Sequence, residues 1–212
     1  MLAHRLGMCY NTLMNVIYTY RDVPYLNLTN RCPCRCVFCL RETQQGMGDA
    51  ATLWHNQEPA WLDIEQALQS FDFAGAGEAV FCGYGEPTCA LENLTRAAAW
   101  LREHHPQLRL RLNTNGLGDL LHGRAIAADF AGLIDSVSIS LNAPNAARYH
   151  DLVRTTWGEE AFAAVLAFAQ AAKQYIPDVV LSVVDVLSDE EIAQCQAIAD
   201  GLGLPLRVRA ME

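Results

Sequence analysis

Strand-like and helical segments alternate along most of this chain of 212 residues. Short apolar runs, of the kind that form buried strands, are each followed by a segment with helical spacing of its apolar residues. The strand-like runs are 24–29, 79–82, 108–113, 136–141, 179–186 and 206–209, and the helical runs are 61–71, 91–104, 125–133, 159–175 and 188–201. Such alternation indicates a parallel sheet covered by crossover helices.

Six strand-helix units predict an α/β fold in which the parallel sheet curls into a partial (β/α)6 TIM-like barrel. A closed barrel of eight units needs about 250 residues, so six units suit this length. One more strand-like run, 15–20, precedes the first unit as a short N-terminal extension. We expect residues 1–212 to form a single domain, with its site at the carboxyl ends of the strands.

Four cysteines follow the first barrel strand. Cys32, Cys36 and Cys39 form a C-x3-C-x2-C frame, in which three thiolates can bind three irons of a [4Fe-4S] cube and leave the fourth iron open. Structural zinc usually joins two ligand pairs from separate segments, and the sequence offers no second pair. We interpret Cys34, placed between two of these ligands, as a non-ligand. Zinc and a redox pair remain the alternatives.

A glycine-rich segment, Gly-Tyr-Gly-Glu-Pro at 83–87, follows the second barrel strand. Glycine lets the backbone come close to a ligand, and a carboxylate can offset an ammonium charge. The alternative is a tight strand-to-helix turn with Pro87 at the first helical position.

The cysteine frame, with Phe38 just before its last cysteine, and the segment 83–87 together resemble the radical S-adenosylmethionine (radical SAM) superfamily. The family has a Gly-Gly-Glu-Pro motif after its second strand, so this chain departs by one residue, Tyr84. The resemblance implies that the three frame cysteines are the metal ligands and catalytic residues. It also implies that S-adenosylmethionine is bound by Phe38, Gly83, Tyr84, Gly85 and Glu86. Segments 28–34 and 137–145 resemble, more narrowly, the compact radical SAM proteins associated with TatD-type hydrolases.

Polar side chains on the inward faces of later strands extend the expected site. The candidates for cofactor contacts are Asn113, Ser138, Ser140 and Asn142. A barrel interior filled only for packing would favour Val, Ile and Leu, so the resemblance implies ribose or carboxylate contacts. For Ser138, simple filling of a narrow interior remains open. Arg209, near the end of the last strand, is expected to hold a carboxylate of S-adenosylmethionine or of a substrate, unless Glu212 is its structural partner.

The resemblance implies an enzyme with two cofactors, a [4Fe-4S] cluster and S-adenosylmethionine. A reduced cluster would cleave S-adenosylmethionine to a 5'-deoxyadenosyl radical, which takes hydrogen from an unidentified small-molecule or protein substrate. Expected partners are a one-electron donor such as flavodoxin or ferredoxin, and a TatD-type hydrolase. Two alternatives stay open: an activating enzyme that makes a glycyl radical on a partner protein, and a non-enzymatic iron-sulfur or zinc module.

Charge and hydropathy argue against several other classes. A net charge of −9 gives no long-range attraction to nucleic acid or to an anionic membrane. No apolar run approaches the roughly 20 residues of a transmembrane helix, and the first residues lack the apolar core of a signal peptide. Eight cysteines suit a reducing compartment as metal ligands and buried thiols. We expect a cytoplasmic protein.

Overall fold

The computed structural model describes residues 15–211, whose seven strands form one sheet in the order β1 to β7. The strands are β1 (Ile17–Tyr20), β2 (Val23–Leu26), β3 (Glu78–Phe81), β4 (Arg109–Thr114), β5 (Ser136–Ser140), β6 (Asp178–Val184) and β7 (Leu206–Arg209). β1 pairs antiparallel with β2, and every later pair is parallel. The prediction of six parallel strands with a short N-terminal extension is confirmed.

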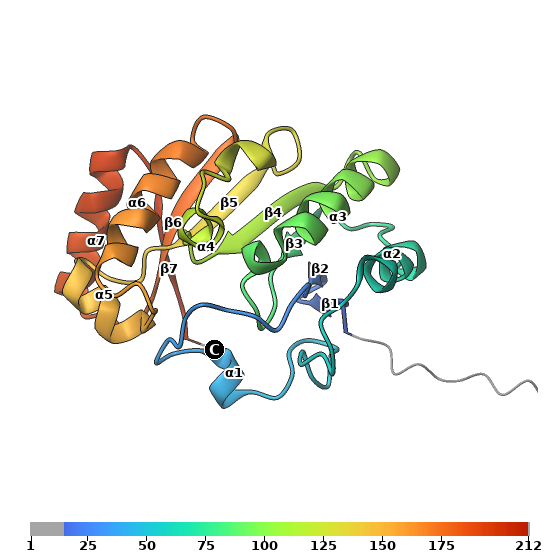
Figure 1. Ribbon diagram of the computed structural model, residues 1–212, viewed down its shortest axis with the longest axis horizontal. Coiled ribbons are helices and arrows are strands. Elements are labelled where there is room, and N and C mark those ends of the chain that lie inside the picture. The colour runs from blue at the N-terminus through green and yellow to red at the C-terminus, as the bar shows by residue number, and fades with distance from the viewer. Residues whose placement is uncertain (1–14, 212) are drawn as a thin grey trace, which may run out of the picture.

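Helices cover the outer face of the curved sheet, where α3, α6 and α7 run alongside the strands (Figure 1). The helices are α1 (Leu40–Thr43), α2 (Trp61–Ser70), α3 (Leu91–His104), α4 (Gly118–His122), α5 (Ala146–Val153), α6 (Glu160–Ala172) and α7 (Asp189–Leu202). Two 3-10 turns, η1 (Pro87–Ala90) and η2 (Ala127–Phe130), complete the set that the structure describes. Within residues 15–211, no helix is long and apolar enough to cross a membrane.

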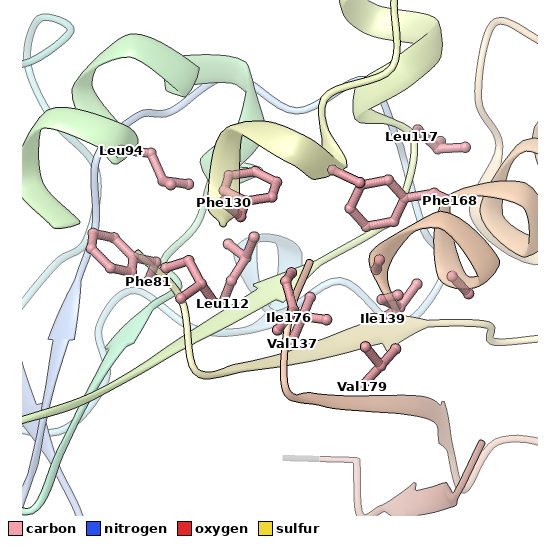
Figure 2. Packing of buried hydrophobic residues seen from close by; sticks show 14 of the residues in the cluster. Phe81, Leu94, Leu112, Leu117, Phe130, Val137, Ile139, Phe168, Ile176 and Val179 are labelled. Carbon is pink, nitrogen blue, oxygen red and sulfur yellow. The ribbon is translucent and has the colours of Figure 1, made fainter. Parts of the chain in front are cut away.

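The main core lies between the sheet and these helices (Figure 2). Every second residue of a strand faces the helices, because side chains alternate across a sheet. The strand side chains of this layer meet apolar side chains from α3, η2 and α6. Members at 0–1% exposure include Phe81, Leu94, Leu112, Phe130, Val137, Ile139 and Phe168. Full burial of such a side chain contributes roughly 1.5–3 kcal/mol, so this layer holds the barrel together.

The helix expected at 125–133 is wrong in position. The chain instead forms the short helix α4 and then the turn η2. Gly123 adopts a left-handed conformation with φ of 63° and ends α4, and Gly132, with φ of 71°, follows η2. The apolar residues that suggested a helix therefore lie in and around η2, where Ile126, Ala127 and Phe130 pack on the core.

Two other helices, α5 and α7, differ from expectation. Helix α5 was missed, although Asn145 caps it by accepting a 2.9 Å hydrogen bond from the Arg148 backbone N–H. The predicted capping box of α7 is confirmed, since Ser188 and Glu191 bond reciprocally. That helix passes Gly201 and ends before Gly203, whose φ of 64° supplies the left-handed residue that terminates a helix.

The inner face of the sheet is polar. On β4 the residues that alternate with the core are Arg109, Arg111 and Asn113. Arg111 pairs with Glu78 of β3 at 2.9 Å, and Arg109 pairs with Asp178 of β6. Both guanidinium groups therefore have the carboxylate partners that make a position inside the barrel tolerable.

Candidate cluster and cofactor site

The cysteine loop is held at both ends. It leaves β2 and crosses toward α5, as the blue segment of Figure 1 shows. There the backbone N–H groups of Arg35 and Val37 donate to the carbonyls of Val153 and Leu152 at 3.0 and 2.9 Å. Cys39 then starts helix α1. The loop is thus anchored to the first parallel strand and to the helix after β5.

The four thiols of this loop differ in burial. Cys34 is 2% exposed, whereas Cys32, Cys36 and Cys39 are half-buried, and all four are free thiols. The Cys34 thiol hydrogen-bonds with Cys32 and Cys36, which raises the pKa of Cys34 and lowers the pKa of Cys32. Among the described residues no three His, Cys, Asp or Glu side chains are gathered as a metal site. Cluster binding therefore requires the thiols to exchange their mutual hydrogen bonds for iron.

Gly85 lies directly against the base of the cysteine loop. A Cβ atom at this position would stand 2.1 Å from the Thr29 carbonyl oxygen and 2.8 Å from that of Arg31. The neighbouring Glu86 N–H donates to the Arg31 carbonyl at 2.8 Å. Only glycine allows this approach, so the loop after β3 forms one wall of the site.

The Glu86 carboxylate is buried and joins three segments. Its Oε1 accepts hydrogen bonds from the Thr88 N–H, the Thr88 hydroxyl and the Thr114 hydroxyl at 3.1, 2.8 and 2.7 Å. Its Oε2 accepts the Asn115 N–H at 2.7 Å. Burial raises the pKa of Glu86, and these hydrogen bonds oppose that rise. The carboxylate therefore organises the loops after β3 and β4 around the cysteine loop.

The Tyr84 side chain packs against the segment 44–54. Its hydroxyl donates to the Gln44 carbonyl, and its ring meets Trp54 edge-on with centroids 5.2 Å apart. It belongs to a small second core with Tyr18 and Leu53. Tyr84 therefore replaces the first glycine of Gly-Gly-Glu-Pro without leaving the loop. Its side chain packs under the segment 44–54, while its backbone stays in the glycine loop.

Asn142, two residues after β5, has an unusual backbone conformation. Its φ is 57°, it is 5% exposed, and its Oδ1 has no hydrogen-bond partner among the described residues. The buried hydroxyl of Tyr149 on α5 also lacks a partner within that part of the chain. Buried polar atoms without partners are costly, so these two atoms mark places where a bound group can supply the missing hydrogen bonds.

The other expected cofactor contacts are spread over the inner face. Ser138 is buried and Ser140 half-buried, one above the other on β5. Phe38 is half-buried and packs against the main core rather than standing free. Asn113 hydrogen-bonds Cys82 and accepts a 3.2 Å bond from Arg111. The structure therefore places Asn113 and the two serines inside the barrel, and Phe38 at its edge.

Arg209 faces into the barrel from an exposed position on β7. Burial raises the pKa of Cys82, and the positive charge of Arg209 is among the groups that oppose this rise. No hydrogen bond or ion pair joins the Arg209 side chain to a residue in 15–211. Glu212, its suggested structural partner, lies outside the described residues.

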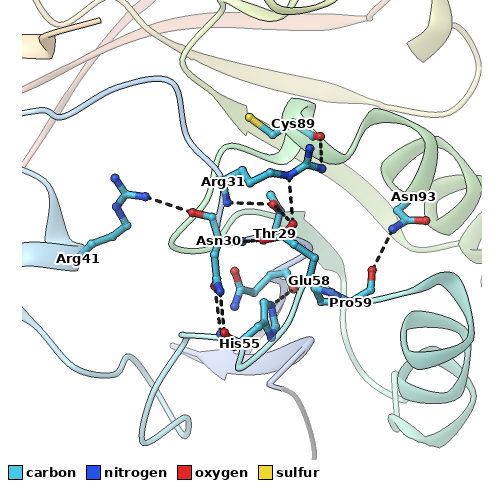
Figure 3. Close-up of polar contacts among 10 residues, drawn as sticks. Thr29, Asn30, Arg31, Arg41, His55, Glu58, Pro59, Cys89 and Asn93 are labelled. Atoms are coloured by element: carbon cyan, nitrogen blue, oxygen red, sulfur yellow. Dashed lines mark hydrogen bonds and ion pairs between the residues drawn. The ribbon is translucent and has the colours of Figure 1, made fainter.

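A polar network that the sequence analysis missed locks the segment before α2 onto the cysteine loop (Figure 3). The Glu58 carboxylate accepts hydrogen bonds from the Thr29 hydroxyl, the Asn30 N–H at 2.9 Å and Arg31 Nε at 3.2 Å. Asn30 also exchanges two hydrogen bonds with the backbone of His55, at 2.7 and 3.0 Å. A single acid in a polar run carries no sequence signal of such a role.

Arg41 and Asn115 are further contacts of the loop that the sequence analysis did not single out. Arg41 donates to the carbonyls of Asn30 and Cys34 at 3.2 and 3.4 Å (Figure 3 draws the first). The Asn115 side chain donates to Cys34 Sγ at 3.5 Å. The position of Arg41, two residues after the last frame cysteine, was the available signal for a cation beside the thiols.

These features fit an iron-sulfur cluster and a polar cofactor. Three accessible free thiols surround a buried fourth, a glycine backbone lies beside them, and an unpartnered acceptor stands at the end of β5. In this partial barrel the thiols follow the first parallel strand and the glycine loop follows the second, so both lie at the carboxyl ends of neighbouring strands.

A family model for the Radical SAM superfamily matches residues 26–200, and the chain belongs to that superfamily. Its members use a [4Fe-4S] cluster and S-adenosylmethionine, with electrons from a reductant. The resemblance drawn from the cysteine frame and the glycine segment is confirmed. The narrower likeness to TatD-associated proteins finds no support in these comparisons.

Curated relatives include the proteins named GTP 3',8-cyclase 2 from Mycobacterium bovis and Mycobacterium tuberculosis. Each is 33% identical to this chain over 160 residues, which cover 70% of the chain and 38% of the relative. The chain thus matches less than half the length of these proteins.

Solved structures with the same fold include Streptococcus suis SuiB bound to precursor peptide SuiA. It has a TM-score of 0.64 at 15% identity and covers 87% of this chain and 38% of SuiB. Another is anSMEcpe with bound AdoMet and Cp18Cys peptide, with a TM-score of 0.60 at 18% identity, covering 89% of this chain and 50% of that protein.

Proposed function

We propose that this chain is the catalytic barrel of a radical SAM enzyme, in which Cys32, Cys36 and Cys39 hold the cluster. The observation that carries the assignment is the difference in burial within the cysteine loop. Cys34 is sealed in the core, while the three frame thiols are half-buried at the barrel mouth. When bound, the reduced cluster supplies one electron for the cleavage of S-adenosylmethionine, from which a 5'-deoxyadenosyl radical arises.

The chain's own residues bind and orient the cofactor. The backbone at Gly83 and Gly85 offers close approach, and the Asn142 Oδ1 supplies an acceptor that no described residue uses. Glu86 acts mainly through position, because its four hydrogen bonds to this chain already occupy both carboxylate oxygens. Ser138, Ser140 and Asn113 line the path from the mouth into the barrel, and Arg209 is the cation that attracts an anionic group there.

The substrate and partners are proposed only by class. The name of the curated relatives includes GTP, and the two solved structures above contain peptides. Both a small molecule and a protein are therefore candidate substrates for hydrogen abstraction. A glycyl-radical activating enzyme falls within the second class. Flavodoxin or ferredoxin would supply the electron. Free thiols at every described cysteine favour a reducing compartment such as the cytoplasm. All described strands belong to one sheet, which supports a single domain.

Anaerobic reconstitution of single Cys→Ala variants tests the assignment. We expect the wild type and Cys34→Ala to bind about four irons per chain, and Cys32→Ala, Cys36→Ala and Cys39→Ala to lose the [4Fe-4S] spectrum. Dithionite-driven release of 5'-deoxyadenosine should follow the same order. A full cluster in Cys32→Ala, or its loss in Cys34→Ala alone, would reject the proposed ligands. Iron binding without S-adenosylmethionine cleavage would favour a non-enzymatic iron-sulfur module, and zinc with no iron a zinc module.

A further inference from the structure

A cavity of about 710 Å³ opens at the amino-terminal ends of the strands, opposite the cysteine loop. Ligand sites in proteins commonly measure roughly 300–1,000 Å³. The charged side chains that line this cavity are Glu78, Arg109, Arg111, Lys173, Asp178 and Arg207. Since parallel barrels place their chemistry at the other end of the strands, the cavity lies apart from the cysteine loop, and it shares Ser138 with the proposed cofactor path.

The charges in this cavity do not cancel. Arg111 is neutralised by Glu78 at 2.9 Å, and Arg109 is neutralised by Asp178. Among the residues that the structure describes, Lys173 donates only to the Leu202 carbonyl, at 2.6 Å. Across residues 15–211, no side chain or carbonyl partners the guanidinium of Arg207. Two cations therefore remain uncompensated inside one cavity of a chain whose net charge is −9.

Hydroxyl groups add neutral donors to the same space. Ser136 and Ser138 line the cavity from β5 and are 9% and 6% exposed. Neither hydroxyl makes a hydrogen bond to a residue in the described part of the chain. Together, the guanidinium, the ammonium and the two hydroxyls offer more hydrogen-bond donors than one carboxylate can accept. They suit the several oxygens of a phosphate.

We propose that this cavity is a binding site for a phosphate-bearing small molecule, held by Arg207 and Lys173 with Ser136 and Ser138. The site lies apart from the cysteine loop, so its occupancy is measurable whether or not a cluster is present. Pyrophosphate is a suitable probe, because it consists of phosphate groups alone. Its binding therefore reports on phosphate recognition without contributions from other chemical groups.

The first experiment uses the fact that Lys173 is the only lysine of the chain. The holoprotein is treated with an amine-acetylating reagent at low ionic strength, with and without pyrophosphate, and labelling is followed by mass spectrometry. We expect pyrophosphate to slow acetylation of Lys173 at least fivefold while the rate at the N-terminal amine stays unchanged. Equal labelling of Lys173 in both conditions would overturn the proposal.

The second experiment compares pyrophosphate affinity by calorimetry in the wild type, Arg207→Gln and Arg96→Gln. Arg96 lies on α3 and pairs with Glu92 on the outer surface, so it is a charge-matched control. We expect Arg207→Gln to bind at least tenfold more weakly and Arg96→Gln to match the wild type. Equal affinity in all three proteins, or equally tight binding of succinate by the wild type, contradicts a phosphate site. Cluster content and S-adenosylmethionine cleavage, assayed without pyrophosphate, report on the proposed function independently.

Discussion

Glu86 and Asn115 are joined by a 2.7 Å hydrogen bond from the Asn115 backbone N–H to the Glu86 carboxylate. Asn115 in turn donates from its side chain to Cys34 Sγ at 3.5 Å. The glycine loop, the loop after β4 and the buried cysteine are therefore connected through two residues. Changes at Glu86 should affect the shape of the whole site as well as its charge.

Replacement of Glu86 by Gln tests this link. The amide oxygen can keep the bonds from Thr88 and Thr114, but its NH2 group then opposes the Asn115 N–H, which is left without an acceptor. We expect a loss of about 1–3 kcal/mol in unfolding free energy and weaker S-adenosylmethionine binding, with the cluster retained. Urea denaturation and a cofactor titration measure both effects. Glu92→Gln, on exposed α3, is the control, and unchanged values for Glu86→Gln would show that the carboxylate is dispensable.

Gly85→Ala should disrupt the contact between the glycine loop and the cysteine loop. The new Cβ would stand 2.1 Å from a backbone oxygen, whereas the same change at Gly77 meets no atom within 4 Å. Overpacking of this kind costs about 1–3 kcal/mol. We expect Gly85→Ala to lower the thermal midpoint and the iron content after reconstitution, while Gly77→Ala retains the wild-type iron content. Equal behaviour of the two variants would contradict the observed packing.

Glu58 should make the anchoring of segment 44–58 dependent on pH. Burial alone would raise the pKa of Glu58, but hydrogen bonds from Thr29, Asn30 and Arg31 lower it below its usual value. A carboxyl group with a depressed pKa contributes stability above its unfolded pKa, near about 4.3, and loses it as pH falls through the folded pKa.

Amide hydrogen exchange in segment 44–58 measures this effect. At pH 7 we expect Glu58→Gln to exchange faster than the wild type there, because the charged acceptor is gone. The difference should shrink as pH falls through the depressed pKa of Glu58 and disappear once wild-type Glu58 is itself protonated. Glu103→Gln, an exposed acid on α3, should behave as the wild type throughout. A difference between Glu58→Gln and wild type that persists at low pH would exclude titration of this carboxyl group as its cause.

Substitutions of Arg209 and Arg111 should separate an effect on S-adenosylmethionine cleavage from an effect on protein stability. Arg209 has no partner among the described residues, so Arg209→Gln should change the unfolding free energy by less than about 0.5 kcal/mol and slow S-adenosylmethionine cleavage. Arg111→Gln leaves the half-buried Glu78 without its 2.9 Å partner and should cost about 1–3 kcal/mol. If Arg209→Gln lowers stability and leaves cleavage at full rate, the anion-binding role is wrong and a structural partner such as Glu212 is indicated.

The architecture could be predicted because each parallel strand is a short apolar run followed by a helix-forming segment. The errors lie where local pattern is weak. The run 125–133 has helical apolar spacing, yet Gly123 ends α4 before it, and within it the chain forms the 3-10 turn η2 before Gly132 takes a left-handed conformation. Helix α5 is only eight residues long, and a helix this short gains its stability from tertiary packing, here against α6, rather than from its own sequence.

The site could be predicted where residues are close in sequence, as in the cysteine frame and the glycine segment. It could not be predicted where the contact joins distant segments. Glu58 meets Asn30 across 28 positions, and Asn115 meets Cys34 across 81. Tyr84 departs from the Gly-Gly-Glu-Pro motif of the family, but its ring is part of a separate small core. Such roles depend on contacts in the folded structure, and no spacing between residues in the sequence predicts them.

The hydrogen bonds from Arg35 and Val37 to Val153 and Leu152 have a consequence for how the protein is made. The ribosome produces the cysteines about 115 residues before their anchor, which at roughly 5–20 residues per second is an interval of roughly 6–23 s. During that time the loop has its contacts to β2, Glu58 and Glu86 available but lacks the backbone hydrogen bonds to α5 that complete the mouth. Iron delivery is therefore best timed after synthesis of α5, and the nascent chain has to keep four neighbouring thiols reduced until then.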